Sequence, residues 1–170
     1  MAQACAAQSP FEGKLEADDS YFGLKRIRGK RGRGAGSETI VSGLLKLGNC
    51  VYTEIVPNAS KATLQAIIRG KVYPNSVIQT DSWRDYDGLV DIGVDRHFRV
   101  NHGNNEFDRG SKHVNGIESF WSYAKHRSAQ FHGVAKHTFA IHLEETEIRF
   151  NHRHDNLYLA LLKLLRIRPI

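Results

Sequence analysis

Three acidic residues in this sequence stand where metal-dependent chemistry on a phosphate ester would need them. Asp18 lies within the mixed run 16–23, Asp81 directly follows residues 77–80, which are typical of a short buried strand, and Glu118 lies in a segment with helical spacing. If the three converge, their oxygens suit Mg²⁺ or Mn²⁺. Two such ions can activate a nucleophile and stabilise the leaving oxygen of a phosphodiester.

Each acid also has an ordinary structural interpretation. Asp18 could belong to an exposed edge strand, where a carboxylate is solvated at little cost. Asp81 could cap the short helix that we expect over residues 83–90, because aspartate is a good N-cap residue. Glu118 could lie on the solvated face of its helix. None of the three indicates a catalytic site alone; their combination does.

Glu118 shares one stripe of its predicted helix with other polar residues. Asn115 comes three residues before it, Ser122 four after and Lys125 seven after, so all four lie on one side at 3.6 residues per turn. The neighbouring side is apolar, with Ile117, Phe120, Trp121 and Ala124. From this stripe Lys125 could bind a phosphate of a DNA backbone.

The positive charge of the chain is concentrated in one segment. The chain carries 24 Lys and Arg against 18 Asp and Glu, a net charge of +6. Residues 24–37 alone contain six of these bases and no acid: Lys25, Arg26, Arg28, Lys30, Arg31 and Arg33. The remainder of the chain is therefore neutral overall. A basic, glycine-rich loop of this kind suits DNA phosphates, although a solvated disordered loop would look the same.

The elements that would position these residues form a mixed α/β pattern. We expect strands over residues 14–22, 39–47, 50–56, 77–81 and 97–101, with a hairpin turn at Gly48 and Asn49. Helices are expected over 60–69, from about 113 onwards, around 139–150, and over 157–165. This order predicts a sheet covered by helices and is compatible with a ribonuclease H-like sheet. The last helix is very apolar, and we expect it to join the core in preference to a dimer contact.

Length and composition narrow the class of protein. The chain has 170 residues, 41% of them hydrophobic, which suits one globular domain with its own core. No apolar run is long enough to span a bilayer, and the first ten residues lack the features of a secretory signal. The two cysteines form neither a disulfide framework nor a Cys-x-x-Cys metal pair. An intracellular, reducing location is therefore expected, and no membrane partner.

Several segments resemble the catalytic domain of DDE transposases from bacterial insertion sequences, the ISXO2-like group in particular. The similarity covers about residues 11–153 and is carried by the following runs: Phe11-Glu12-Gly13, Glu16-Ala17-Asp18-Asp19-Ser20-Tyr21-Phe22-Gly23, Gly29-Lys30-Arg31-Gly32-Arg33-Gly34, Val51-Tyr52-Thr53, Thr80-Asp81-Ser82-Trp83 with Tyr86, His113-Val114-Asn115-Gly116-Ile117-Glu118-Ser119-Phe120-Trp121 with Lys125, and Phe150-Asn151-His152-Arg153. Each run is weak alone, but the combination is specific.

This resemblance implies a ribonuclease H-like fold and a transposase activity. It implies metal-dependent cleavage of DNA at the ends of an insertion sequence and strand transfer into target DNA, with two Mg²⁺ or Mn²⁺ ions. Asp18, Asp81 and Glu118 match the three catalytic and metal-binding acids of the family. Asn115 and Lys125 match its asparagine and its basic residue on the third acid's helix, and Asp19 stands where the family usually has Glu. A homo-oligomer in the active complex and a bacterial cytoplasm, near the nucleoid, are implied as well.

The chain departs from the family ahead of its first acid. Only 17 residues precede Asp18, whereas family members usually carry a zinc ribbon and a helical DNA-reading region there. We therefore expect a tail over residues 1–10, a catalytic domain over 11–155 and an apolar helix over 156–170, in an N-terminally truncated transposase. The alternatives are an inactive remnant that binds DNA non-specifically through its basic loop, and a host nuclease of the same fold.

Overall fold

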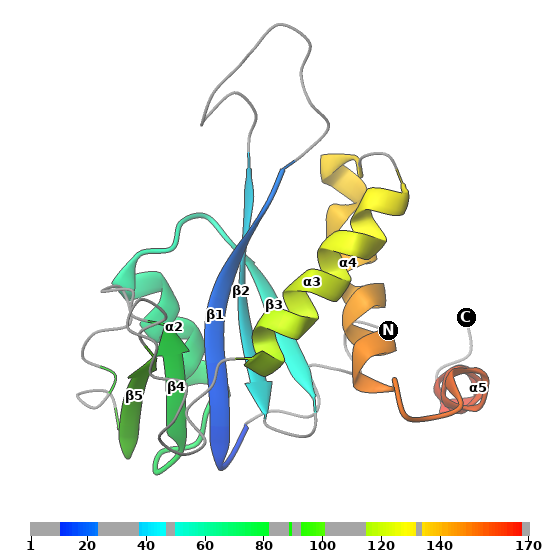
Figure 1. Cartoon of the computed structure of the whole chain (residues 1–170). Coiled ribbons are helices and arrows are strands. Elements are labelled where there is room, and N and C mark those ends of the chain that lie inside the picture. The colour runs from blue at the N-terminus through cyan, green and yellow to red at the C-terminus, as the bar shows by residue number, and fades with distance from the viewer. Residues whose placement is uncertain are drawn as a thin grey trace, which may run out of the picture.

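The computed structural model contains one five-stranded sheet with helices on both faces (Figure 1). It describes residues 11–23, 38–46, 50–81, 89, 93–100, 115–131 and 134–167. The basic run 24–37, the expected turn at 48–49 and nearly all of the expected helix over 83–90 lie outside these residues. Within them, no helix combines the length and the apolar character needed to cross a bilayer.

The sheet has the order β3-β2-β1-β4-β5. Its strands are β1 (Lys14–Phe22), β2 (Thr39–Lys46), β3 (Val51–Val56), β4 (Val77–Asp81) and β5 (Arg96–Val100). β2 is antiparallel to both of its neighbours, whereas β1, β4 and β5 are mutually parallel. This order and direction match a ribonuclease H-like sheet, so the predicted fold class is confirmed.

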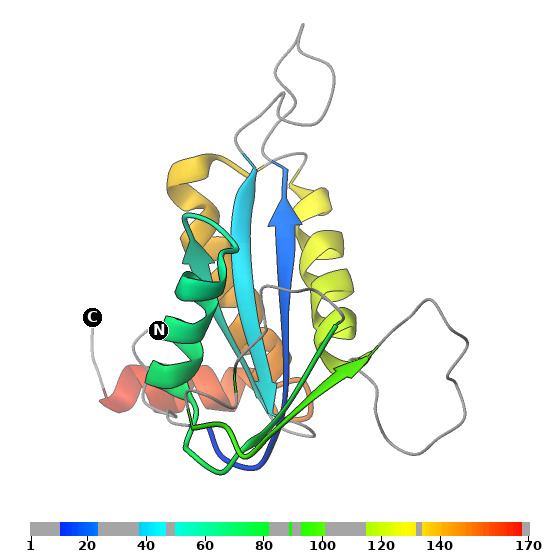
Figure 2. The ribbon, with the colours of Figure 1, turned by 90° about the vertical axis from the view of Figure 1, so that its left-hand side faces the viewer.

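The helix α2 (Lys61–Lys71) connects β3 to β4 and covers one face of the sheet (Figure 2). It begins where the sequence predicts, because the Ser60 side chain accepts a hydrogen bond from the Thr63 amide at 3.4 Å. Its apolar side, Leu64, Ile67 and Ile68, is buried with Leu15 and Ala17 of β1 and with Ile78 of β4. β1 therefore presents its odd-numbered side chains, Leu15 and Ala17, to α2.

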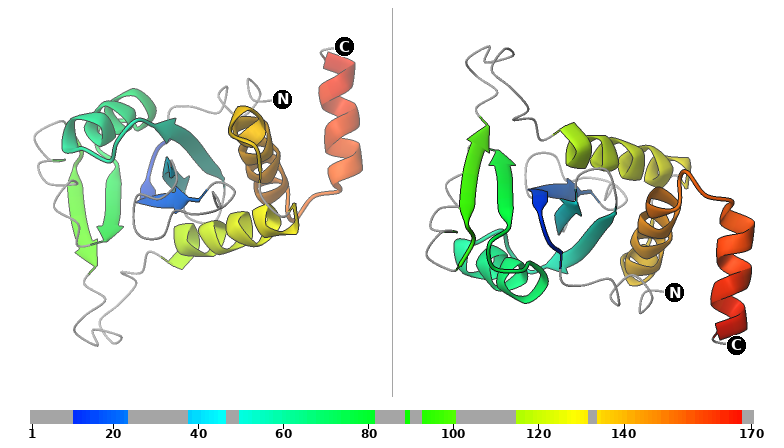
Figure 3. Two further views of the ribbon diagram at one scale, coloured as in Figure 1. Left: turned by 90° about the horizontal axis from the view of Figure 1, so that it is seen from above. Right: turned by 90° about the horizontal axis from the view of Figure 1, so that it is seen from below.

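The opposite face is covered by α3 (Asn115–Gln130) and α4 (Lys136–Asn151) (Figure 3). Ile117, Phe120, Trp121 and Ala124 of α3 are all buried, as their spacing predicts. They pack in one cluster with Phe139 and Leu143 of α4 and with apolar residues of β1, β2 and β3. The polar stripe of α3 remains exposed: Asn115, Glu118, Ser122 and Lys125.

α4 also covers the edge strand β3 by hydrogen bonds to its backbone. The Asn151 side chain accepts from the Val51 amide at 2.7 Å and donates to the Val51 carbonyl at 2.9 Å. One turn earlier, the buried Glu147 carboxylate accepts from the Thr53 amide and hydroxyl at 2.8 and 2.7 Å. Backbone groups at a sheet edge are otherwise free to pair with another chain, and these two side chains occupy them.

The last helix, α5 (Leu157–Ile167), does not join the core. It lies beyond α4, on the side away from the sheet (Figures 1 and 3). Four large apolar residues on it are between 44% and 69% exposed: Tyr158, Leu159, Leu162 and Leu165. The prediction that this helix is part of the core is therefore wrong, because α3 and α4 already occupy that face of the sheet.

Candidate active site

Asp18 lies in the middle of β1, on the face of the sheet that α3 covers. Its carboxylate oxygen Oδ2 accepts a hydrogen bond from the indole Nε1 of Trp121 at 3.1 Å. Trp121 follows Glu118 by three residues, so it lies about one turn further along α3, beside the exposed stripe that carries Glu118. The structure thus brings the first predicted acid to the helix that carries the third.

A glycine makes room for this contact. Gly43 on β2 is the register partner of Asp18. A Cβ atom at Gly43 would lie 2.6 Å from the Trp121 ring and 3.0 Å from Ile117. Because position 43 has no side chain, the indole can come close to β2, where its Nε1 reaches Asp18. A glycine inside a strand is a sign of such a close approach.

A second acid of β1, Glu16, also contacts α3. It is 1% exposed, and its Oε2 accepts a hydrogen bond from the Ile117 amide at 2.7 Å. Two-residue alternation predicts Glu16 and Asp18 on one face of β1 and Asp19 on the other. Both Glu16 and Asp18 do contact α3, and the Asp19 carboxylate oxygens are themselves shielded from solvent.

Asp81 is next to Asp18 in the backbone of the sheet. β1 and β4 pair in parallel up to Ala17 and Thr80, and the two acids are the residues that follow. Asp81 is also the last residue of β4, as the sequence predicts. The carboxyl end of a parallel strand is where open α/β sheets bind ligands. The side chain of Asp81 lies outside the described part of the structure.

The other predicted contact residues divide between described and undescribed parts of the chain. Asn115 is the exposed first residue of α3. Lys125 is exposed as well, and its Nζ lies 6.0 Å from the centre of the Phe22 ring, four residues beyond Asp18 on β1. The five basic residues Arg26, Arg28, Lys30, Arg31 and Arg33 fall outside the described residues. Among the described side chains, no three His, Cys, Asp or Glu residues form a ready metal-binding group.

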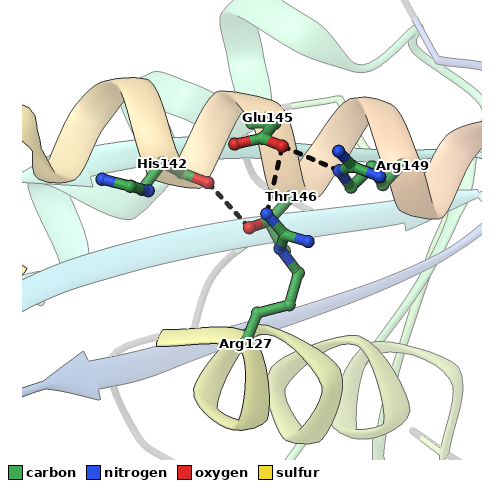
Figure 4. Close-up of polar contacts among 5 residues, drawn as sticks. All are labelled: Arg127, His142, Glu145, Thr146 and Arg149. Carbon is green, nitrogen blue, oxygen red and sulfur yellow. Dashed lines mark hydrogen bonds and ion pairs between the residues drawn. The ribbon is translucent and has the colours of Figure 1, made fainter. Parts of the chain in front are cut away.

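The two helices on the Asp18 face of the sheet, α3 and α4, are joined by a cluster of ion pairs (Figure 4). Glu145 of α4 accepts from Arg149 Nε at 2.8 Å and lies 3.1 Å from Arg127 of α3. The hydrogen bond from Arg149 and the charge of Arg127 hold the pKa of Glu145 below its ordinary value of 4.5. The cluster therefore ties α4 to the helix that carries Glu118.

The sequence of the chain matches the ISXO2-like transposase domain over residues 10–151. The chain belongs to this transposase family. An uncharacterized transposase-like protein of Haemophilus influenzae is 42% identical over 115 residues, which are 68% of this chain and 92% of that protein. The matched span of this transposase-family chain contains all three predicted acids together with Asn115 and Lys125.

Two more distant likenesses accompany this family match. An uncharacterized protein in the transposable element ISH50 of Halobacterium salinarum is 26% identical over 159 residues, which are 85% of this chain and 54% of that protein. A chain of the simian T-cell lymphotropic virus intasome, solved in complex with the PP2A regulatory subunit B56 gamma, is similar over 79% of this chain and 48% of its own. That similarity has a TM-score of 0.45 at 11% identity.

The sequence patterns predict the three acids but not the contacts that surround them. Neither the Trp121–Asp18 bond nor the Glu16–Ile117 bond follows from local spacing, because each joins residues more than 100 positions apart. Gly43 inside a strand and Gly116 at the start of a helix are the available signals. A glycine is unfavourable in both settings, which points to a close approach by another group.

Proposed function

We propose that this chain is the catalytic domain of a DNA transposase, with Asp18, Asp81 and Glu118 as its catalytic acids. The observation that carries the proposal is the contact of Asp18 with Trp121, one helical turn after Glu118. The parallel register of β1 and β4 adds Asp81 as the backbone neighbour of Asp18. Membership of the ISXO2-like family supports the same assignment.

The donor set suits a hard divalent cation. Three carboxylates offer oxygen ligands only, which Mg²⁺ and Mn²⁺ prefer over the nitrogen and sulfur ligands of zinc. Asp18 is half-buried and Glu118 is exposed, so both carboxylates are open to a substrate. A pair of bound ions would activate the attacking water or DNA 3′-hydroxyl and stabilise the 3′ oxygen that leaves. Asp18, Asp81 and Glu118 would hold them.

Other residues of the chain would bind and orient DNA. Lys125 lies two helical turns beyond Glu118 on the exposed stripe of α3, at a suitable position for a backbone phosphate. Asn115, at the start of the same stripe, would contact DNA through its amide. The basic run 24–37 would add charge-driven contacts that do not depend on base sequence. Transposon ends and target DNA would be the partners, in an assembly of more than one copy in the bacterial cytoplasm.

The direct test is plasmid nicking with Mn²⁺, comparing the wild-type chain with Asp81→Asn. Asparagine keeps the shape of the side chain but removes its negative charge. We expect the variant to lose nicking by at least about 100-fold while its melting temperature stays unchanged. Asp95→Asn, which changes an exposed acid just before β5, is the matched control and should nick normally. Undiminished nicking by Asp81→Asn would contradict the assignment.

The local excess of basic residues supports a second candidate, a chain that binds DNA without cutting it. All of the net charge of +6 can be assigned to residues 24–37. This candidate predicts salt-sensitive binding to any DNA sequence, with no Mn²⁺-dependent nicking by the wild-type chain. The nicking assay therefore separates the two functions.

A further inference from the structure

Glu16 is a buried acid next to the candidate site that the three-acid assignment does not use. It lies in the central strand β1 and is 1% exposed. A carboxylate removed from water is costly unless hydrogen bonds or charges compensate it. Glu16 lies two residues before Asp18 on the same face of β1, so a group that contacts Glu16 also lies close to the candidate site.

The start of α3 supplies that compensation. The first amides of a helix have no partner within the helix, and this end of the helix carries a partial positive charge. Glu16 Oε2 accepts from one of them, the amide of Ile117, at 2.7 Å. The carboxylate thus acts as a cap for α3, contributed by a strand about 100 residues earlier in the chain.

Gly116 is the residue that permits this approach. A Cβ atom at position 116 would lie 2.9 Å from Glu16 Oε2 and 2.4 Å from Leu45 Cδ2. A larger residue would require the Leu45 and Glu16 side chains, or the first turn of α3, to move. Glu16 and Gly116 therefore form a matched pair, one on the strand and one on the helix.

The hydrogen bond from Ile117 to Glu16 links α3 beside Glu118 to β1 near Asp18. Ile117 is the neighbour of Glu118, and Glu16 is on the same strand face as Asp18. One turn further along α3, Trp121 makes the second link, to Asp18 itself. Two contacts one turn apart define both the position of a helix along a strand and its rotation about its own axis. The Glu16 contact is the one nearer to Glu118.

We propose that Glu16 is a positioning residue that holds Glu118 at the correct distance from Asp18 for metal binding. This inference rests on the proposed function. Residues that orient a metal ligand typically change metal affinity by about 10- to 100-fold when they are removed. Glu16 would do so by fixing the helix backbone beside the ligand.

The experiment measures Mn²⁺ binding by the full chain, without DNA, from the loss of the EPR signal of free Mn²⁺. We expect Glu16→Ala to weaken binding by about tenfold or more. Glu16→Gln should stay within about threefold of wild type, because its amide oxygen can still accept from Ile117. Gly116→Ala, whose methyl group would crowd the Glu16 carboxylate and Leu45, should weaken binding as well.

Glu147→Ala is the matched control. Glu147 is also buried and also accepts from a backbone amide, but it does so on β3, away from β1. It should lower the melting temperature to a similar degree and leave Mn²⁺ affinity unchanged. Equal effects of Glu16→Ala and Glu147→Ala on Mn²⁺ affinity would overturn the positioning role, because stability alone would then explain both.

Hydrogen exchange at the Ile117 amide separates this inference from the proposed function. In Glu16→Ala, faster exchange at Ile117 together with weaker Mn²⁺ binding is the expected result. Faster exchange with wild-type Mn²⁺ affinity would overturn the positioning role and leave the proposed function intact. A wild-type chain that binds no Mn²⁺ would overturn both.

Discussion

At the scale of single residues, the environment of Asp18 depends on a glycine, Gly43, in the neighbouring strand β2. Gly43 leaves a gap opposite Asp18, and the Trp121 ring fills it. Trp121 then combines two roles, as a core side chain that is 4% exposed and as a donor to Asp18. Its hydrogen bond limits the directions in which the Asp18 carboxylate can point.

Gly43→Ala tests this arrangement. The new methyl group would stand 2.6 Å from the indole, so the ring must move and the hydrogen bond to Asp18 must lengthen. We expect a loss of about 1–3 kcal/mol in the free energy of unfolding, measured with urea, and weaker Mn²⁺-dependent nicking. Gly70→Ala, on the exposed side of α2 with open space around it, is the control and should be neutral or slightly stabilising. Unchanged nicking by Gly43→Ala would show that Trp121 does not constrain Asp18.

The sequence predicts the three acids as a site only in combination, since each has an ordinary structural interpretation alone. Asp81 ends a short, mostly buried strand, and Glu118 lies in a regular helical stripe. Trp121 is equally visible as an apolar residue of α3, but nothing local distinguishes its indole nitrogen as a partner of Asp18. That contact depends on how α3 crosses β1, which is decided by tertiary packing.

At the scale of elements, α4 protects the edge of the sheet and supports α3. Its residues Glu147 and Asn151 are one turn apart and bind β3 at Thr53 and Val51, two residues apart. A helix turn rises about 5.4 Å and two strand residues about 6.6 Å, so the two spacings nearly match. This agreement explains how one helix side satisfies alternate backbone groups of the edge strand.

Asn151→Ala should expose this edge. It removes two hydrogen bonds and leaves the Val51 backbone groups without these partners. We expect a loss of about 2 kcal/mol in the free energy of unfolding and increased self-association, measured by urea unfolding and light scattering. Gln130→Ala, at the exposed end of α3, is the control. Wild-type stability in Asn151→Ala would show that solvent fully replaces the two hydrogen bonds.

The Glu145 cluster should make the α3–α4 contact sensitive to acid. The pKa of Glu145 is lowered in the folded protein, so its contribution is present above about pH 4.5 and is lost as the pH falls through the folded pKa. Because the group is 38% exposed, we expect at most about 1 kcal/mol. Urea unfolding should therefore show wild type more stable than Glu145→Gln at pH 7 and equal to it near pH 3. A difference that persists at pH 3 would contradict this.

At the scale of the whole molecule, a ribonuclease H-like sheet carries the candidate site on its central strand β1 and at the end of the neighbouring β4. The order of the strands is compatible with hydrophobic periodicity but is not fixed by it, whereas the helices α2, α3 and α4 follow from the three- and four-residue spacing of their apolar residues. The position of α5 does not follow in this way, because an apolar composition favours burial but does not indicate the surface against which the helix packs. Leu159 and Leu162 therefore remain exposed within the described part of the chain.

The location of the charge predicts how the molecule binds DNA. Neutralising Arg26, Arg28, Lys30, Arg31 and Arg33 together should flatten the salt dependence of binding, by about 0.9 in the logarithmic slope for each phosphate that is no longer neutralised. Fluorescence anisotropy with a labelled duplex measures this slope. Neutralising Lys61 and Arg69 on α2 is the control and should leave the slope unchanged. An unchanged slope after the five substitutions would place DNA binding elsewhere.

The most direct test of the candidate site compares two adjacent acids of β1 in the Mn²⁺-dependent nicking assay. Asp18 lies on the α3 face of the strand and Asp19 does not, and each can be changed to asparagine with little change in volume. We predict that Asp18→Asn abolishes nicking, whereas Asp19→Asn, folded to the same extent by circular dichroism, retains it. Equal nicking by the two variants would contradict the claim that the α3 face of β1 carries the chemistry.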